Sequence, residues 1–120
     1  MSRAQQIENI IVGSLVCDFT EHWPAVRCCI TEEMMQDEFN RKIFKRIKDL
    51  SSNKESINVT TVARGFSVEE LSKLFTLTND YDFNTKKWEY NEAAYLYGGS
   101  YTTVSFDDYI STFIKNYGRG

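Results

Sequence analysis

The sequence predicts an all-α protein, and three observations support this prediction. Apolar residues recur at helical spacing in one segment after another. Helix-capping and helix-ending residues separate these segments. Alternation of apolar and polar residues is nearly absent, and SYTTVSF, at 100–106, is the one stretch that resembles a strand. With six Gly and one Pro among 120 residues, there is little turn material for a multi-strand sheet. We therefore expect a compact multi-helix domain.

The first two expected helices precede residue 30. The first is capped by Ser2 and has its apolar residues at helical spacing: Ile7, Ile10, Ile11 and Leu15. The second is short and runs from about His22 or Pro24 to Cys28, because proline is comfortable only in the first turn of a helix. Thr31 then caps a brief turn that leads into a longer helix.

That longer helix, DEFNRKIFKRIKDL at 37–50, is strongly amphipathic. Its apolar side consists of Phe39, Ile43, Phe44, Ile47 and Leu50, and its basic face consists of Arg41, Lys42, Lys45, Arg46 and Lys48. A basic helix can contact nucleic-acid phosphates. However, Lys and Arg are also the usual exposed residues of an amphipathic helix, and the basic face itself contains no aromatic residue that could stack on bases. We favour a solvated face and keep DNA binding as the alternative.

Two more helices are expected between residues 58 and 78. A short one is capped by Asn58 and ends at Gly65. The next begins with a capping box of Ser67 and Glu70. Its expected buried stripe is Val68, Leu71, Leu74 and Phe75. The polar stretch NDYDFNT, at 79–85, is expected to form a loop.

The last two helices are expected to form a C-terminal hairpin. One runs from about Lys87 to Tyr97 and is closed by two glycines. The other begins at Ser105, is capped with the help of Asp108 and ends at Gly118. The latter has the strongest amphipathic pattern in the chain, at Phe106, Tyr109, Ile110, Phe113, Ile114 and Tyr117. The single domain, 1–120, therefore divides into a helical head (1–78), a loop (79–87) and a helical hairpin (88–117).

The sequence contains almost no sign of catalytic chemistry. Phosphate-binding loops of the G-x-x-x-x-G-K-[ST] and G-x-G-x-x-G types are absent, and no cofactor or metal site is expected. His22 is the only histidine, and with Cys17 or Cys28 it forms a conceivable nucleophile pair. We favour instead a histidine on the surface, beside three cysteines (Cys17, Cys28 and Cys29) that are reduced and buried. The apolar run at 10–16 is too short to span a membrane and has no signal-cleavage site after it. Together with three cysteines that favour reduced thiols, this predicts a cytoplasmic protein.

Several short motifs occur in a characteristic order. IENIIVGSLVCD, at 7–18, is similar to E-x-x-V-L-G-S-L-L-x-D, and Trp23 and Val26 match W-x-x-V. MQDEFNRKIFKRIKDL, at 35–50, is similar to F-x-x-x-x-H-R-x-I-F-x-x-I-x-x-L, with Asn40 in place of the histidine. INVTTVA, at 57–63, is similar to I-D-x-x-T-V-A, and residues 92–117 contain weaker matches. Together these motifs resemble the N-terminal domain of DnaB-type replicative DNA helicases. Residues 66–92 depart from the family pattern, and the ATPase motor is missing.

This resemblance implies a non-catalytic oligomerisation and protein-interaction domain that organises a helicase ring and receives primase or a helicase loader. DNA would then be contacted only indirectly, through the parent helicase. The chain is either an excised domain or a small stand-alone relative, and we favour the excised domain. An aromatic stripe on a terminal hairpin is a typical anchor for association. We expect self-association through Tyr95, Tyr97, Tyr109, Phe113 and Tyr117. The alternative is a small DNA-binding protein that uses the face from Arg41 to Lys48.

Overall fold

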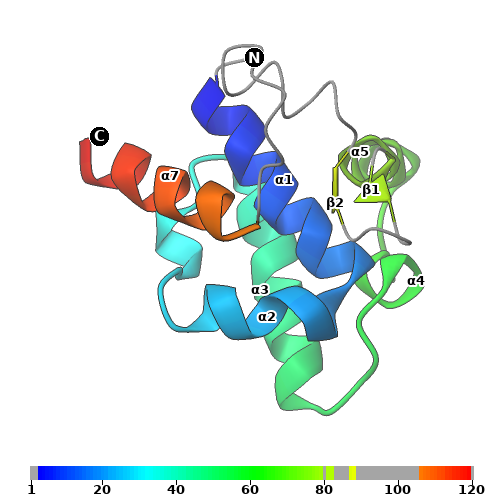
Figure 1. The fold of residues 1–120 in the computed structure, drawn as a ribbon. Coiled ribbons are helices and arrows are strands. Elements are labelled where there is room, and N and C mark those ends of the chain that lie inside the picture. Colours follow the sequence, from blue (N-terminus) through cyan, green and yellow to red (C-terminus); the bar gives the residue numbers. More distant parts are fainter. Residues whose placement is uncertain (1–2, 80, 83–86, 89–105, 120) are drawn as a thin grey trace.

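The computed structural model describes residues 3–79, 81–82, 87–88 and 106–119 (Figure 1). The element order is α1 (Arg3–Cys17), α2 (Phe19–Arg27), η1 (Glu32–Met34), α3 (Glu38–Ser52), α4 (Val59–Val62), α5 (Val68–Thr78), β1 (Tyr81–Asp82), β2 (Lys87–Trp88) and α7 (Phe106–Arg119). The protein is thus all-α, as the sequence predicts. Its described strands are one antiparallel pair of two residues each, with Tyr81 opposite Trp88.

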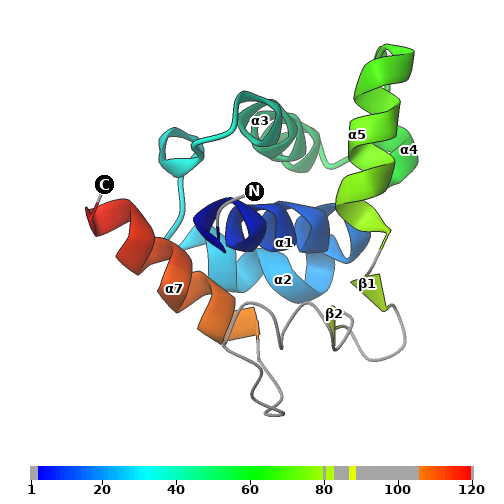
Figure 2. The same ribbon diagram turned by 90° about the horizontal axis from the view of Figure 1, so that it is seen from above.

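Helix α1 is the centre of the fold. It contacts α2, α3, α4, α5 and α7, and α5 and α7 lie on opposite sides of it (Figures 1 and 2). Every residue from Ile10 to Val16 is buried, including Gly13. A helix that is apolar on all sides is stable only when neighbours surround it. The sequence of α1 therefore determines its central position.

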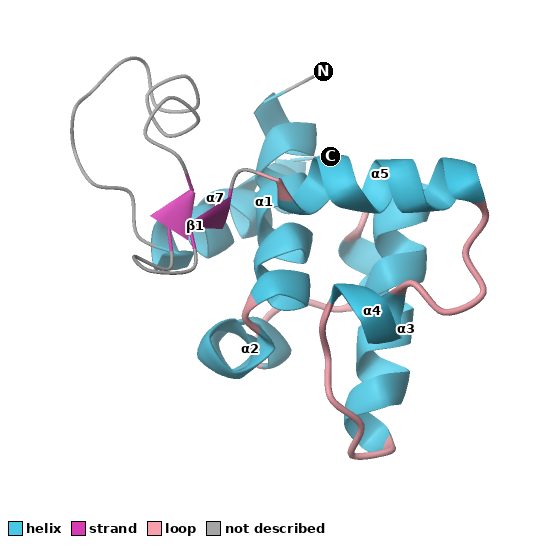
Figure 3. Ribbon diagram, turned by 90° about the vertical axis from the view of Figure 1, so that its right-hand side faces the viewer, coloured by secondary structure: helices cyan, strands magenta, loops and turns pink. Residues whose placement is uncertain are grey.

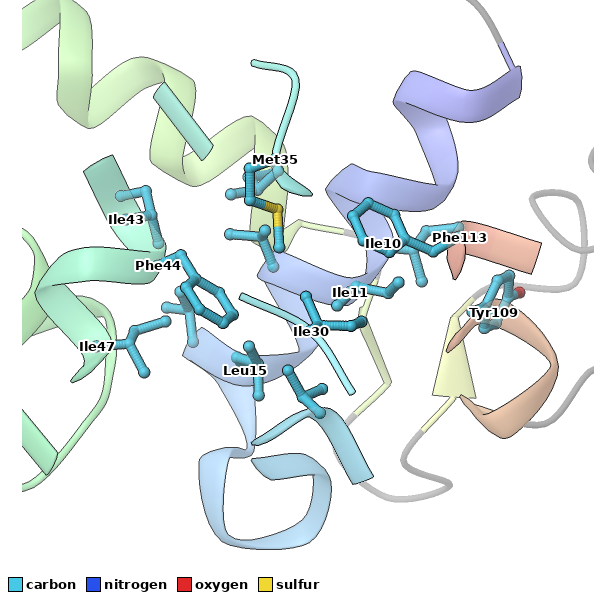
Figure 4. Close-up of a cluster of buried hydrophobic side chains, with 14 of the residues drawn as sticks. Ile10, Ile11, Leu15, Ile30, Met35, Ile43, Phe44, Ile47, Tyr109 and Phe113 are labelled. Atoms are coloured by element: carbon cyan, nitrogen blue, oxygen red, sulfur yellow. The ribbon is translucent and has the colours of Figure 1, made fainter. Parts of the chain in front are cut away.

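The hydrophobic core extends from α3 through α1 to α7. Phe44 and Ile47 on α3 point toward α1, and Tyr109 and Phe113 on α7 lie near Ile10 on α1 (Figure 4). All five side chains are buried. The expected phase of α3 is confirmed at these positions, while Phe39 at its start is only partly buried. Helix α3 from the middle of the chain and α7 from its C-terminal part thus pack on the same N-terminal helix.

Helix α2 differs from the expectation at its N-terminal end. It begins at Phe19, so Pro24 lies inside the helix rather than in its first turn. Proline removes one backbone donor within a helix. The burial of Val26 and the stacking of Phe19 on Trp23, with ring centroids 5.3 Å apart, help to hold the helix in this position.

Helices α4 and α5 begin as expected but α5 buries a different side. Asn58 and Ser67 are the N-caps, and Gly65 adopts a φ of +78° between the two helices. In contrast, Val68 is 85% exposed and Phe75 is 57% exposed, so the expected buried stripe is wrong at these two positions. The buried residues of α5 are Leu74 and Leu77.

The expected C-terminal hairpin is described only in part. Lys87 and Trp88 belong to β2, and the remainder of the first expected hairpin helix lies outside the described residues. The second expected helix is present as α7 and continues through Arg119, one residue beyond its expected end at Gly118. Its expected cap, Ser105, also lies outside the described residues.

Candidate interaction surfaces

A buried carboxylate fixes the start of α3 against α1. Glu8 is 2% exposed, and its two oxygens accept hydrogen bonds from the backbone N–H groups of Gln36 (2.6 Å) and Asp37 (3.1 Å). The side-chain amide of Asn40 donates to the same carboxylate at 2.9 Å and to Asn9 at 2.7 Å. A negative charge at this end of a helix is favourable, because the backbone N–H groups there have no partner within the helix.

Asp37 completes this helix start. It is the N-cap of α3, and its side chain accepts from the backbone N–H of Phe39 at 2.8 Å. Sequence reasoning named Glu8 and Asn40 only as motif positions, and the structure brings the two into contact. The signal that could have predicted the role of Glu8 is its place within an otherwise apolar face of α1.

The basic face of α3 is largely engaged within the chain. Lys42 forms an ion pair with Glu70, and this contact lowers the pKa of the Glu70 carboxyl group. The ammonium of Lys42 also lies 5.0 Å from the centre of the Phe66 ring. Arg46 donates to the backbone carbonyl of Arg64 at 3.0 Å. These contacts hold the loop after α4 and the start of α5 on α3.

Two of the other three basic residues of this face also contact the rest of the chain. Arg41 donates to the backbone carbonyl of Met35 at 2.7 Å, and Lys48 lies 3.9 Å from the carboxylate of Glu32. Lys45 is exposed and has no ion pair or hydrogen bond with the described part of the chain. Four of the five expected DNA contacts therefore contact other residues of the chain, and the structure gives no added support to DNA binding.

The aromatic stripe of α7 divides into an inner and an outer set. Tyr109 and Phe113 are 3% and 4% exposed, because they pack in the core of the chain itself. Tyr117 is 47% exposed, and Ile114 beside it is 38% exposed. Of the five residues expected to mediate self-association, Tyr117 alone is exposed in the described part of the chain, and Tyr95 and Tyr97 lie outside it.

A small cleft lies beside Tyr117. It has a volume of about 270 Å³ and is formed between the start of α1, the η1–α3 connection and the end of α7. Met34 and Phe113 contribute apolar lining, and Gln5 and Asn116 contribute side-chain amides. The exposed ring of Tyr117 thus borders a concave surface.

Helix α5 exposes a second apolar surface that sequence reasoning missed. Val68, Leu71 and Phe75 lie along a shallow groove whose other lining residues are Ser72, Thr76 and Asn79. Figure 3 shows α5 along one edge of the molecule. The sequence pattern groups these three apolar residues with Leu74 in one stripe, so it gives no sign that this part of the stripe stays exposed.

The possible nucleophile pair is disfavoured. His22 is buried rather than on the surface, and its ring centroid lies 4.2 Å from that of Phe106. Burial, with a smaller contribution from Asp18, raises the pKa of Cys17 to about 11, whereas an activated nucleophile needs a lowered thiol pKa. Cys28 and Cys29 are exposed, so the expectation of buried thiols is wrong for both.

The comparison with protein families identifies the domain. Residues 1–95 match the model described as the DnaB-like helicase N terminal domain. This chain belongs to that family. The matched domain is the non-catalytic part of DnaB helicases, and the match includes Glu8, Asn40 and the whole of α5. No curated protein and no solved structure matches the chain significantly. Of the described helices, none is long and apolar enough to cross a membrane.

Proposed function

We propose that this chain is an oligomerisation and protein-interaction domain of a replicative DNA helicase and has no catalytic activity of its own. Membership of the DnaB-like family supports the helicase context. The observation that carries the proposal is the exposure of large apolar side chains on two helices, Val68 and Phe75 on α5 and Ile114 and Tyr117 on α7. Grouped apolar side chains on a surface mark sites of association.

We assign self-association to the outer side of α7. Ile114 and Tyr117 are three residues apart and therefore lie on one side of the helix. Tyr109 and Phe113 support them from beneath by anchoring α7 in the core. A tyrosine suits an interface of this kind, because its ring is apolar and its hydroxyl can stay in contact with water at the rim. A symmetric dimer is the commonest way for two identical patches to cover each other.

We assign partner binding, to primase or a helicase loader, to the exposed side of α5. Because α5 and α7 lie on opposite sides of α1 (Figures 1 and 2), a dimer formed through α7 leaves α5 accessible. The groove along Val68, Leu71 and Phe75 has an uncharged polar rim of Ser72, Thr76 and Asn79. An apolar centre with a polar rim is the usual composition of a protein interface.

Sedimentation equilibrium over a wide concentration range tests the self-association. The parent is expected to dimerise, and Tyr117→Asp is expected to weaken the dimer at least tenfold by placing a charge in the contact. Lys115→Asp is the matched control, because Lys115 is also exposed on α7 but lies one residue from Ile114 and two from Tyr117 and so does not share their side of the helix. A parent that stays monomeric at high micromolar concentration would refute self-association, and a dimer unaffected by Tyr117→Asp would place the interface elsewhere.

Isothermal titration calorimetry with the primase or helicase loader from the organism that encodes this chain tests partner binding. Phe75→Ser is expected to weaken binding at least tenfold, whereas Lys73→Ser, on the same helix, is expected to leave it within twofold. Equal affinity of the parent and Phe75→Ser would contradict the assignment to α5.

A further inference from the structure

Two adjacent cysteines lie in the turn that follows α2. Cys28 and Cys29 are both exposed, and their sulfur atoms are 3.0 Å apart. The third cysteine, Cys17, is partly buried on α1. Neither the fold nor the proposed function uses the exposed pair. Two thiols in contact at the surface present a pair of soft donor atoms, and thiophilic ligands prefer such donors.

The backbone on both sides of this pair is fixed. The carbonyl of Val26 accepts hydrogen bonds from the N–H groups of Cys29 (3.1 Å) and Ile30 (2.9 Å). Val26 and Ile30 are both buried, so the turn is anchored in the core at each end. The backbone that carries the two thiols therefore loses little conformational freedom when both bind the same atom, which favours bidentate over single-site binding.

The spacing of the pair favours a bridging atom over a direct disulfide. The Cα atoms of adjacent residues are about 3.8 Å apart across a trans peptide. An unstrained disulfide needs about 4.4–6.8 Å between its Cα atoms. An atom inserted between the two sulfurs relaxes this constraint, because each sulfur then bonds to the inserted atom and the sulfurs can move apart.

The ligand number of the site also limits what it can hold. In the described part of the chain, no group of three or more His, Cys, Asp or Glu residues is placed to bind a metal ion. A structural zinc site takes four protein ligands, so zinc here would leave two positions to water. Trivalent arsenic in a monosubstituted arsenical needs two thiol ligands, which is the number that Cys28 and Cys29 provide.

We propose that Cys28 and Cys29 form a chelating site for trivalent arsenicals. The reaction with an arsenoxide forms two As–S bonds, one to each cysteine, and breaks the As=O bond. The two thiol protons leave with the oxygen as one molecule of water, and arsenic stays trivalent. The reaction needs no oxidant. Because the second As–S bond forms within the same turn, monothiols do not readily displace the protein from arsenic, whereas a competing dithiol does.

Intact-mass spectrometry of the folded protein with phenylarsine oxide tests this proposal. The parent is expected to carry one adduct per chain that survives excess 2-mercaptoethanol and is removed by 2,3-dimercaptopropanol. Cys28→Ser and Cys29→Ser are each expected to reduce this resistant adduct at least tenfold. Cys17→Ser is the matched control and is expected to retain it. Circular dichroism establishes that each variant is folded.

Three results would overturn the proposal: a parent without a resistant adduct, a resistant adduct in Cys28→Ser, and loss of the adduct in Cys17→Ser. Cys28→Ala provides a second variant that removes the same sulfur without adding a hydroxyl. Because both thiols are exposed, these substitutions are expected to leave the thermal unfolding midpoint nearly unchanged.

Discussion

Replacing Phe44 with Ala is expected to destabilise the domain severely. The side chain is fully buried, and its ring centroid lies 6.0 Å from that of Trp23. Truncating a buried Phe costs about 3–5 kcal/mol, which is a large share of the roughly 5–15 kcal/mol that stabilises a typical domain. If the free energy of unfolding falls by about 1.5 kcal/mol for each molar of urea, the urea concentration at the unfolding midpoint should fall by about 2–3 M. Circular dichroism during urea titration measures this shift.

Lys45→Glu is the matched control for Phe44→Ala. Lys45 is the next residue of α3 but is exposed, so reversing its charge should change the free energy of unfolding by less than about 0.5 kcal/mol. If Phe44→Ala unfolds at the same urea concentration as the parent, the reasoning about the phase and burial of α3 is wrong. Equal destabilisation by both changes would also contradict it.

Four other predictions concern the phase of α5, the role of Glu8, the titration of Glu70 and the absence of ATP hydrolysis. In the same urea assay, Leu74→Ala should lower the free energy of unfolding by about 2–5 kcal/mol, because Leu74 is buried, and Phe75→Ser should lower it by under about 1 kcal/mol, because Phe75 is exposed. The reverse order would refute the phase of α5. Glu8→Gln should cost about 1.5–3 kcal/mol, because backbone N–H groups lose a charged acceptor, and an unchanged midpoint would argue against this role. NMR titration should give Glu70 a pKa below its ordinary 4.5, and the pKa should return toward that value in Lys42→Met. The stability that the Lys42–Glu70 pair adds to the folded state is fully present above the ordinary pKa of Glu70 and is lost as the pH falls through its lowered pKa. The purified chain should not hydrolyse ATP, because it has no phosphate loop, and turnover abolished by a point substitution within the chain would contradict this.

The sequence by itself determined the fold class and several helix starts. Asn58 and Ser67 cap α4 and α5 as expected, because capping depends on hydrogen bonds between residues two or three positions apart. Helix α4 ends at Val62, three residues before its expected end at Gly65, and Gly65 takes a positive φ in the turn that follows. The phase of α3 was also predictable, since its apolar and basic residues lie on opposite sides of the helix and leave one way to pack.

Only the tertiary structure decided which side of α5 is buried. Apolar residues form one wide arc on this helix, with Val68 and Phe75 toward one end and Leu74 and Leu77 toward the other, so its own pattern does not decide which end of the arc is buried. The approach of α1 made that choice. The same physical reason applies to α7, where contact with α1 placed one part of the aromatic stripe in the core and left Tyr117 exposed.

The partner of Glu8 was likewise decided by packing. A charged residue within the apolar face of α1 indicates a buried contact, but its donors are 28 to 32 positions away in the chain. The sequence does not encode which distant backbone N–H groups will meet a given carboxylate. The exposure of Cys28 and Cys29 has the same origin, because the residues around a turn decide whether its side chains reach solvent. Local hydrogen bonds thus determine where helices begin, and contacts between distant segments determine which surfaces remain available for function.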